Sequence, residues 1–295
     1  MSEDQRGPTA QGDDKLGWGM VDEDGSEMWH APPTIRAVNW RARAEWLFRP
    51  KRFLLDRFLR LKRGERLLDF GCGTGGLLID LCRLRGATGI GVDVSQRQVE
   101  IAEEQARRFG AQCTFELYDG SRLPFPDGSF DAACSKDVLG HVPDIQAALR
   151  ELHRVLKPGG RFAVFSESRL GSGSSIVHRL SLAGVNVDPF AEFHVSVFPR
   201  AELLGIFETT GFHVCASYSA VVHRFWLYPE WFEAPLSESE GFPVYRAMNR
   251  SLLRAKRRLG HPGKALANLL SVVDTLTFGR WAECAGLYVL ARKRS

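Results

Sequence analysis

Apolar residues recur in two alternating patterns along most of this 295-residue chain. Short runs of strand length alternate with longer stretches in which apolar residues return every three or four positions, as on one face of a helix. This alternation of strand and helix predicts a parallel sheet with helices on both faces. The predicted strands are 66–70, 88–92, 113–117, 130–134, 162–165, 211–217 and 286–291.

Residues typical of helix ends frame two of the predicted helices. Ser95 precedes a stretch with helical apolar spacing, and its hydroxyl suits the N-cap position. A second such stretch follows Asp144, and the Pro-Gly-Gly sequence at 158–160 is expected to end it. A third helix is expected over 199–210.

Composition divides the chain into five parts. The first residues are rich in Gly, Asp, Glu and Gln, which predicts a mobile tail. Aromatic and basic residues then alternate in helical fashion, and prolines break this stretch into two short helices. The expected parts are a disordered tail (1–27), an N-terminal helical cap (28–63), a ligand-binding core (64–222), a helical and aromatic insertion (223–281) and the last strand of the core (282–295).

Composition also excludes several classes of protein. Hydrophobic residues make up 44% of the chain and charged residues 25%, which is ordinary for a globular protein. No apolar run is long enough to span a membrane, and the polar start lacks the pattern of a secretory signal, so we expect a cytoplasmic protein. The six cysteines are scattered and have no histidine at ligand spacing, so neither disulfides nor a metal site is expected. The net charge of +4 does not require a nucleic-acid partner.

A glycine-rich turn follows the first predicted strand and opens a helix. Its sequence at 67–76 is Leu-Leu-Asp-Phe-Gly-Cys-Gly-Thr-Gly-Gly, in which Gly71, Gly73 and Gly76 fit the G-x-G-x-x-G pattern. Glycines let the backbone approach a ligand closely. Asp93 ends the next strand at the offset expected of a ribose-binding acid. This pattern alone fits a dinucleotide enzyme or an S-adenosylmethionine enzyme.

Negative charge at the strand ends favours S-adenosylmethionine. Asp69 lies just before the first glycine, where it would repel a pyrophosphate but attract the ammonium group of a methionine moiety. Asp119 closes the third strand, where its carboxylate can accept a hydrogen bond from an adenine amino group. Two further motifs, L-P-F-P-D-G-S-F-D at 123–131 and L-K-P-G-G at 156–160, lead into the fourth and fifth strands.

With D-F-G-C-G-T-G at 69–75, these motifs make the chain resemble the class I S-adenosylmethionine-dependent methyltransferases, especially their small-molecule branch. The resemblance covers about 63–220 and the terminal strand. It implies an α/β fold with a Rossmann-like, doubly wound, seven-stranded mixed sheet whose last strand is antiparallel. It also implies S-adenosylmethionine as cofactor.

The resemblance assigns cofactor contacts to eight residues at the carboxyl ends of the predicted strands. They are Asp69, Gly71 and Gly73 at the methionine end together with the backbone of Lys136, Asp93 at both ribose hydroxyls, Val94 against the adenine ring, and Asp119 with the Gly120 backbone at the adenine amino group.

The loop after the fourth strand is where the methyl acceptor is expected, since ligands bind at the carboxyl ends of parallel strands. Asp137 and His141 match the Asp-x-x-x-His spacing of phosphoethanolamine methyltransferases, in which the aspartate meets the amine and the histidine is the acid/base partner. The chain departs from that family because no tyrosine precedes Tyr118. Two roles stay open for His141: a base that takes a proton from the acceptor, or a packing residue that hydrogen-bonds a backbone carbonyl.

Several other residues are candidates for the acceptor pocket. The Trp-His pair at 29–30 suits a lid, and Glu167, His178 and His194 lie after the fifth strand. Each of these has an ordinary structural role as its alternative. The aromatic residues at 225–232 predict either an apolar wall of the pocket or a separate small core.

The insertion also contains a basic helix without acidic residues at 244–264. Such a helix can contact an anionic membrane surface or an acidic partner, or it can present a solvated face. Its expected basic face consists of Arg246, Arg250, Arg254 and Arg257, and its expected apolar face of Val244, Met248, Leu252, Ala255 and Leu259.

These observations predict an S-adenosylmethionine-dependent methyltransferase that acts on a small or medium-sized, aromatic or lipid-like acceptor by in-line displacement. Alignment of the acceptor can supply much of the catalysis, so a dedicated base is optional. Two alternatives stay open. One is an RNA methyltransferase, which the arginines at 36–63 and 246–264 favour, and the other is a non-catalytic binding module on the same fold.

Overall fold

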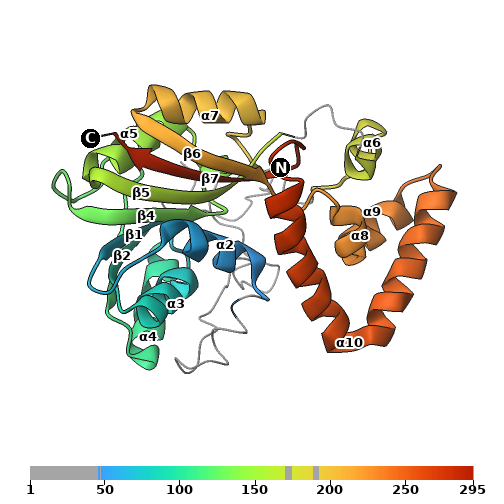
Figure 1. Ribbon diagram of the computed structural model, residues 1–295, viewed down its shortest axis with the longest axis horizontal. Coiled ribbons are helices and arrows are strands. Elements are labelled where there is room, and N and C mark those ends of the chain that lie inside the picture. The colour runs from blue at the N-terminus through green and yellow to red at the C-terminus, as the bar shows by residue number, and fades with distance from the viewer. Residues whose placement is uncertain (1–45, 47, 170–174, 189–192, 295) are drawn as a thin grey trace, which may run out of the picture.

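The structure is a computed structural model that describes residues 46, 48–169, 175–188 and 193–294. The expected tail, most of the expected cap and the pair at 29–30 lie outside the described residues. A sheet flanked by helices forms the main body, and a helical arm extends from one end of it (Figure 1). The strands are β1 (Arg66–Phe70), β2 (Thr88–Asp93), β3 (Cys113–Leu117), β4 (Phe130–Lys136), β5 (Leu156–Glu167), β6 (Phe212–Ser219) and β7 (Gly286–Lys293).

The strand order confirms the expected α/β fold. The seven strands lie in the order β3-β2-β1-β4-β5-β7-β6, with β1 to β5 parallel and β7 antiparallel to both of its neighbours. The direction of strand addition reverses between β1 and β4, and such a switch point opens a crevice at the carboxyl ends. The glycine-rich turn follows β1, and the loop with Asp137 and His141 follows β4.

Helices cover both faces of the sheet and bury a separate core on each. Apolar residues of α2, α3 and α4 pack on one face, and those of α5 and α7 pack on the other (Figure 1). The second core contains Phe162, which stacks on Phe207 and packs against Phe212. The flanking helices are α2 (Pro50–Leu59), α3 (Gly76–Arg85), α4 (Gln96–Phe109), α5 (Ile145–Val155) and α7 (Arg200–Thr209).

The helix ends agree with the sequence at α4 and differ from it at α5. The Ser95 hydroxyl accepts a hydrogen bond from the Gln98 amide, which confirms the predicted N-cap. The α5 helix ends at Val155, before the Pro-Gly-Gly sequence at 158–160. The Pro-Gly-Gly sequence instead belongs to β5, which is therefore longer than predicted. A register shift against β4 accommodates these three residues as an irregularity within the strand.

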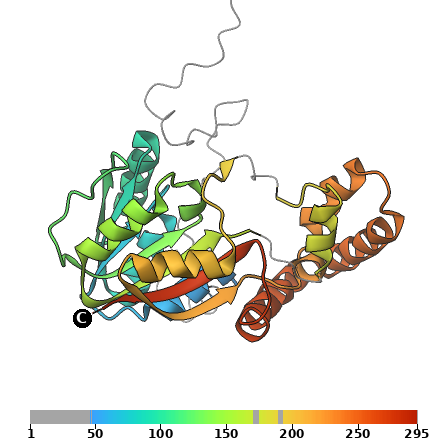
Figure 2. The same ribbon diagram turned by 90° about the horizontal axis from the view of Figure 1, so that it is seen from above.

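The insertion between β6 and β7 is helical, as expected. Together with α6 (Ile176–Leu182), its helices enclose a third, smaller core. The longest of them is a bent arm (Figures 1 and 2), and the bend lies at Gly260, whose φ of 57° and ψ of −133° are not helical. The inserted helices are α8 (Arg224–Leu227), η3 (Pro229–Phe232), α9 (Glu233–Glu238) and α10 (Pro243–Thr277).

The first limb of α10 departs from the apolar face that the sequence predicts. The side chain of Leu253 is buried, whereas Val244 and Leu259 are 66% and 57% exposed. Met248 and Leu252 pack on the third core, as the predicted apolar face requires. Lys256 also faces the insertion, where its ammonium donates to the Leu227 carbonyl of α8 at 2.8 Å and to the Glu230 carboxylate of η3 at 2.7 Å. Of the helices in the described part of the chain, none is both long and apolar enough to cross a membrane.

We expect Phe162→Ala to lower the free energy of unfolding by about 3 to 5 kcal/mol, because it leaves a cavity between two packed rings. Urea denaturation with an unchanged slope would measure this loss. Trp281→Ala is the control, since its side chain is 81% exposed and its removal should change stability by less than about 0.5 kcal/mol. A loss no larger than that of the control would show that this core does not depend on Phe162.

Candidate cofactor and acceptor site

The glycine-rich turn after β1 is held against the end of β2 by backbone hydrogen bonds. The amides of Gly71 and Cys72 donate to the Val92 carbonyl at 2.9 and 3.0 Å. The Gly73 amide donates to the Asp93 carboxylate at 2.7 Å. The other oxygen of that carboxylate accepts from the Ser95 amide at 3.1 Å. Asp93 therefore fixes the turn and the start of α4 together.

Glycine is required in this turn for two different reasons. A Cβ atom on Gly71 would lie 2.3 Å from Val138, so this position is closed by packing. Gly73 has a φ of 51°, which favours glycine, and among the described residues only the Gln98 side-chain oxygen would lie near an added Cβ atom, at 3.6 Å, so its backbone is accessible there. That oxygen is buried and accepts no hydrogen bond from the residues that the structure describes. An accessible backbone beside a buried, unsatisfied acceptor suits a ligand that carries hydrogen-bond donors.

Asp69 is buried at the end of β1, with its carboxylate 3.3 Å from the Cys134 thiol. Burial raises the pKa of Asp69 to about 7, because the surrounding strands exclude the water that would solvate the charge. The sequence predicts an ionised acid here, and the structure gives one whose charge depends on pH. A cationic ligand nearby would favour the ionised form.

Asp119 and Gly120 lie at the exposed rim, after the end of β3. The Asp119 carboxylate accepts from the amide and the hydroxyl of Ser121, both at 2.8 Å. These hydrogen bonds hold the pKa of Asp119 below its usual value. Val94 is partly buried and packs on the core of α5 and α7. The residues assigned to the adenine thus lie at the ends of β2 and β3.

Two lysines hold Asp137, in a contact that the sequence does not reveal. Lys136 lies 2.7 Å and Lys51 2.5 Å from the two oxygens of the Asp137 carboxylate. Burial opposes ionisation of this carboxylate, but the two ammonium charges outweigh it and hold the pKa of Asp137 well below its usual range. The backbone of Asp137 has a φ of 60°, which is uncommon for a residue other than glycine.

His141 is buried in the turn η1 (Leu139–His141), which follows β4. Its Nδ1 atom lies 2.9 Å from the Phe193 carbonyl, so the carbonyl contact of the packing alternative is present. Burial lowers the pKa of His141, which keeps the imidazole neutral at neutral pH. The His194 ring lies 4.8 Å away between ring centres, whereas His178 lies in α6.

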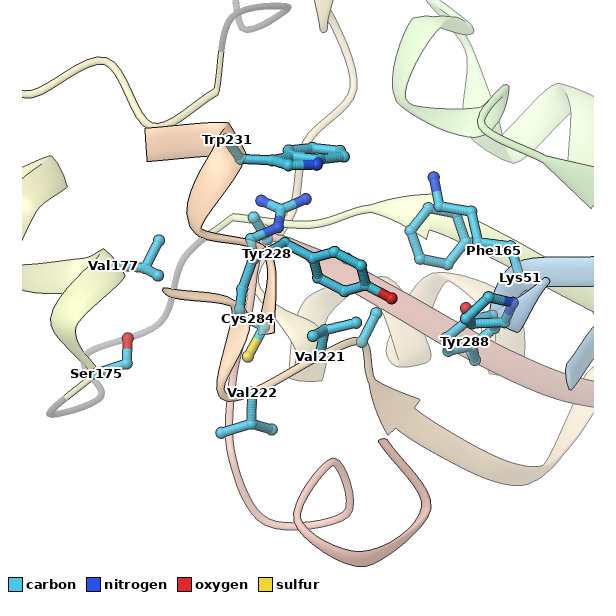
Figure 3. Close-up of a pocket in the computed structure, with 15 residues that line it drawn as sticks. Lys51, Phe165, Ser175, Val177, Val221, Val222, Tyr228, Trp231, Cys284 and Tyr288 are labelled. Atoms are coloured by element: carbon cyan, nitrogen blue, oxygen red, sulfur yellow. The ribbon is translucent and has the colours of Figure 1, made fainter. Parts of the chain in front are cut away.

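A pocket of about 220 Å³ opens between the sheet and the insertion (Figure 3). One end is formed by Lys51 of α2, Phe165 of β5 and Tyr288 of β7, and the other by residues of α8 and η3. Figure 3 shows the Tyr228 hydroxyl pointing toward the Lys51 end. The Trp231 ring lies above the Tyr228 ring in this view. The lining is mostly apolar, as is usual for a small-molecule site.

The aromatic residues of the insertion divide between the two roles that the sequence leaves open. Tyr228 and Trp231 line the pocket, while Phe225 and Phe232 are buried in the third core. Arg224 adds a cation to the pocket, with its guanidinium 4.5 Å from the centre of the Trp231 ring. Burial lowers the pKa of Arg224, though it stays protonated at neutral pH.

Residues 68–164 match the family model described as a methyltransferase domain. Methyltransferase GfsG of Streptomyces halstedii is 40% identical over 108 residues, which make up 36% of this chain and 39% of that protein. The 2-phytyl-1,4-naphtoquinone methyltransferase of Synechococcus elongatus is 42% identical over 112 residues, or 37% of this chain and 48% of that protein. The match therefore spans less than half the length of either relative.

Solved structures share the fold over a larger part of the chain. The crystal structure of the cyclase SpnF has a TM-score of 0.56 and 24% identity, and the match covers 90% of this chain and 88% of that one. A geranyl diphosphate methyltransferase has a TM-score of 0.51 and 19% identity, with coverage of 82% and 75%. The strand order and these matches define a class I methyltransferase fold. The chain thus contains a methyltransferase domain over residues 68–164.

We expect S-adenosylhomocysteine to bind more tightly as the pH rises from about 6 to about 8. With a pKa of about 7, Asp69 is largely protonated at the lower pH and ionised at the higher one, and only the ionised form attracts the ligand's ammonium group. The affinity should rise about tenfold over this range, as calorimetry would measure.

Asp69→Asn removes the titrating group, so this variant should bind weakly at every pH. Asp127→Asn is the matched control, because the Asp127 carboxylate is 77% exposed and pairs with Arg154. An equal pH slope in the wild type and Asp69→Asn would contradict the assignment.

Proposed function

We propose that this protein transfers the methyl group of S-adenosylmethionine to a small or medium-sized, aromatic or lipid-like acceptor bound in the pocket of Figure 3. The position of Lys51 carries this proposal. Lys51 lines the pocket and also pairs with Asp137 in the loop after β4, so the pocket adjoins the edge where this family binds its cofactor. Relatives named for a demethylrifamycin, a phytyl naphtoquinone and a sterol support an acceptor with a large apolar part.

Charge complementarity supports the cofactor. The ionised form of Asp69 suits the ammonium group, and the Gly73 backbone is accessible where the methionine end can approach. Asp93, which the amides of Gly73 and Ser95 orient, suits the ribose hydroxyls. The other predicted contacts are also part of the proposal. Val94, Asp119 and Gly120 contact the adenine, and the Lys136 backbone at the end of β4 contacts the methionine end.

The proposed reaction is an in-line displacement, for which the bound cofactor supplies a methyl group on a positively charged sulfur. The aromatic walls of Tyr228 and Trp231 orient the acceptor and exclude water, and such orientation lowers the barrier considerably. Neutral His141 is suited to take a proton or to keep its loop in place through the Phe193 carbonyl. Asp137 pairs with both lysines and so positions Lys51 at the pocket.

We also propose that the enzyme acts in the cytoplasm. All six cysteines are free thiols, and five of them are buried or partly buried. Free thiols are typical of reducing compartments.

We expect methyl incorporation into at least one compound of a panel of quinones, macrolides and sterols incubated with isotopically labelled S-adenosylmethionine. Asp93→Ala provides the blank, because it removes the carboxylate that holds the glycine-rich turn. Calorimetry with S-adenosylhomocysteine and NAD is the companion measurement. Binding of NAD without any response to S-adenosylhomocysteine would exclude the proposed function.

For an accepted compound, we expect Trp231→Ala to raise KM about tenfold, which corresponds to about 1.4 kcal/mol of lost binding. The affinity for S-adenosylhomocysteine should not change, because Trp231 lines the pocket from η3 of the insertion and not from the strand ends assigned to the cofactor. Trp226→Ala is a matched control, since the two tryptophans are 45% and 46% exposed but Trp226 does not line this pocket. Equal effects of the two substitutions would place the acceptor elsewhere.

A further inference from the structure

Three potential metal ligands from separate segments meet beside the acceptor pocket. They are His141 of η1, Glu167 at the end of β5 and His194 in the segment before α7. One ligand atom from each side chain lies within 4.8 Å of those of the other two. Two imidazoles and one carboxylate form a common ligand set for divalent transition metals.

The Glu167 carboxylate supports a ligand at this point. Its Oε2 atom is buried, and no group within 48–169, 175–188 or 193–294 donates a hydrogen bond to it. The side chain is held close to Gly140, where an added Cβ atom would lie 2.6 Å from the same oxygen. A buried carboxylate oxygen without a donor is costly, and a bound cation removes that cost.

Both histidines are oriented as metal-binding histidines usually are. The Nδ1 atom of His141 lies 2.9 Å from the Phe193 carbonyl, and the Nδ1 atom of His194 lies 3.2 Å from the Asp188 carboxylate. A neutral imidazole that donates from Nδ1 carries its lone pair on Nε2. Carboxylate and carbonyl partners of this kind fix the ring orientation and increase the basicity of the ligand nitrogen.

The charges around the cluster also suit a dication. Glu167 and Asp188 contribute two negative charges when ionised, and the two histidines are neutral as ligands. Asp137 lies between Lys51 and Lys136, so these three residues together carry one positive charge. A divalent ion would neutralise the charges of Glu167 and Asp188.

We propose that His141, Glu167 and His194 bind a divalent first-row transition-metal ion that keeps an open coordination position for an oxygen of the acceptor. Glu167 is two residues from Phe165 on β5, so both side chains lie on one face of the sheet, and Phe165 lines the acceptor pocket. Glu167 also pairs in register with Gly286, another lining residue. The cluster therefore borders the pocket.

The role of the ion rests on the proposed function. A hydroxyl group of the acceptor binds at the open position, and the metal lowers its pKa. The O–H bond then breaks, its electron pair stays on oxygen as a metal-bound alkoxide or phenolate, and the proton passes to solvent. In this arrangement His141 is a ligand, and it needs the same neutral form that a general base would need.

The test is metal binding by the full chain, without an affinity tag and after dialysis against a chelator. Calorimetry with Zn²⁺, Mn²⁺ and Co²⁺ should give one equivalent for at least one ion, and bound Co²⁺ should show visible ligand-field absorption. Glu167→Gln, which keeps the side-chain size, and His194→Ala should each weaken binding by at least about 100-fold. Asp188→Asn should weaken it by about 10- to 100-fold.

His213→Ala is the control, because His213 is exposed on β6 and lies outside the cluster. Its metal affinity should equal that of the wild type. Circular dichroism would establish that each variant is folded. Absence of one-equivalent binding, or binding that survives both Glu167→Gln and His194→Ala, would overturn the proposed site.

The same samples separate this inference from the proposed function. If S-adenosylhomocysteine binds and methyl transfer continues undiminished in the chelator, the metal role is wrong and the proposed function stands. If the metal binds at the cluster but S-adenosylhomocysteine does not, the proposed function fails and the metal site stands. Methyl transfer that stops in the chelator and returns with the ion supports both.

Discussion

The parallel pairing of β1 with both β2 and β4 is the constraint on which the site depends. Because β1 lies between these two strands, the ends of all three meet at one edge of the sheet. Asp69 and the glycine-rich turn come from β1, Asp93 from β2 and the loop with Asp137 from β4. The hydrogen bond from the Gly73 amide to Asp93 then locks two of these ends together. The remaining strands extend this edge, so β3 leads to Asp119 and Gly120 at the rim and β5 ends at Glu167.

Sequence patterns predict those parts of the fold that depend on interactions between residues close together in the chain. The Ser95 cap and the strand from 113 to 117 agree with the structure because capping chemistry and apolar runs act within a few residues. The early start of β5 and the exposure of Val244 and Leu259 were not predicted, because the first depends on a pairing irregularity with β4 and the second on how α10 packs against the other inserted helices. Such contacts join residues far apart in the chain.

The candidate site shows the same division. The glycine-rich turn and the strand-end acids can be identified from the sequence, since each occupies a fixed offset from its strand. The pairing of Lys51 with Asp137 joins α2 to the loop after β4, and no spacing rule predicts it. The expectation of no metal ligands considered histidines near cysteines, whereas the proposed ligands lie on three separate segments. Only the folded chain brings them together.

The hydroxyl of Tyr228 connects one wall of the pocket to α10 and, through α10, to the segment before α2. Its oxygen lies 3.0 Å from both the Asn268 side-chain oxygen and the Ser271 hydroxyl on the second limb of α10, and the Asn268 amide donates in turn to the Phe48 carbonyl just before α2. The pocket wall, the arm and the entrance to the N-terminal helix are thus connected through one short polar chain. Substitutions on the second limb of α10 can therefore change which molecules fit in the pocket. The residues assigned to the nucleoside would not change. Under the proposed function, changes confined to the insertion would alter acceptor choice without changing the sheet.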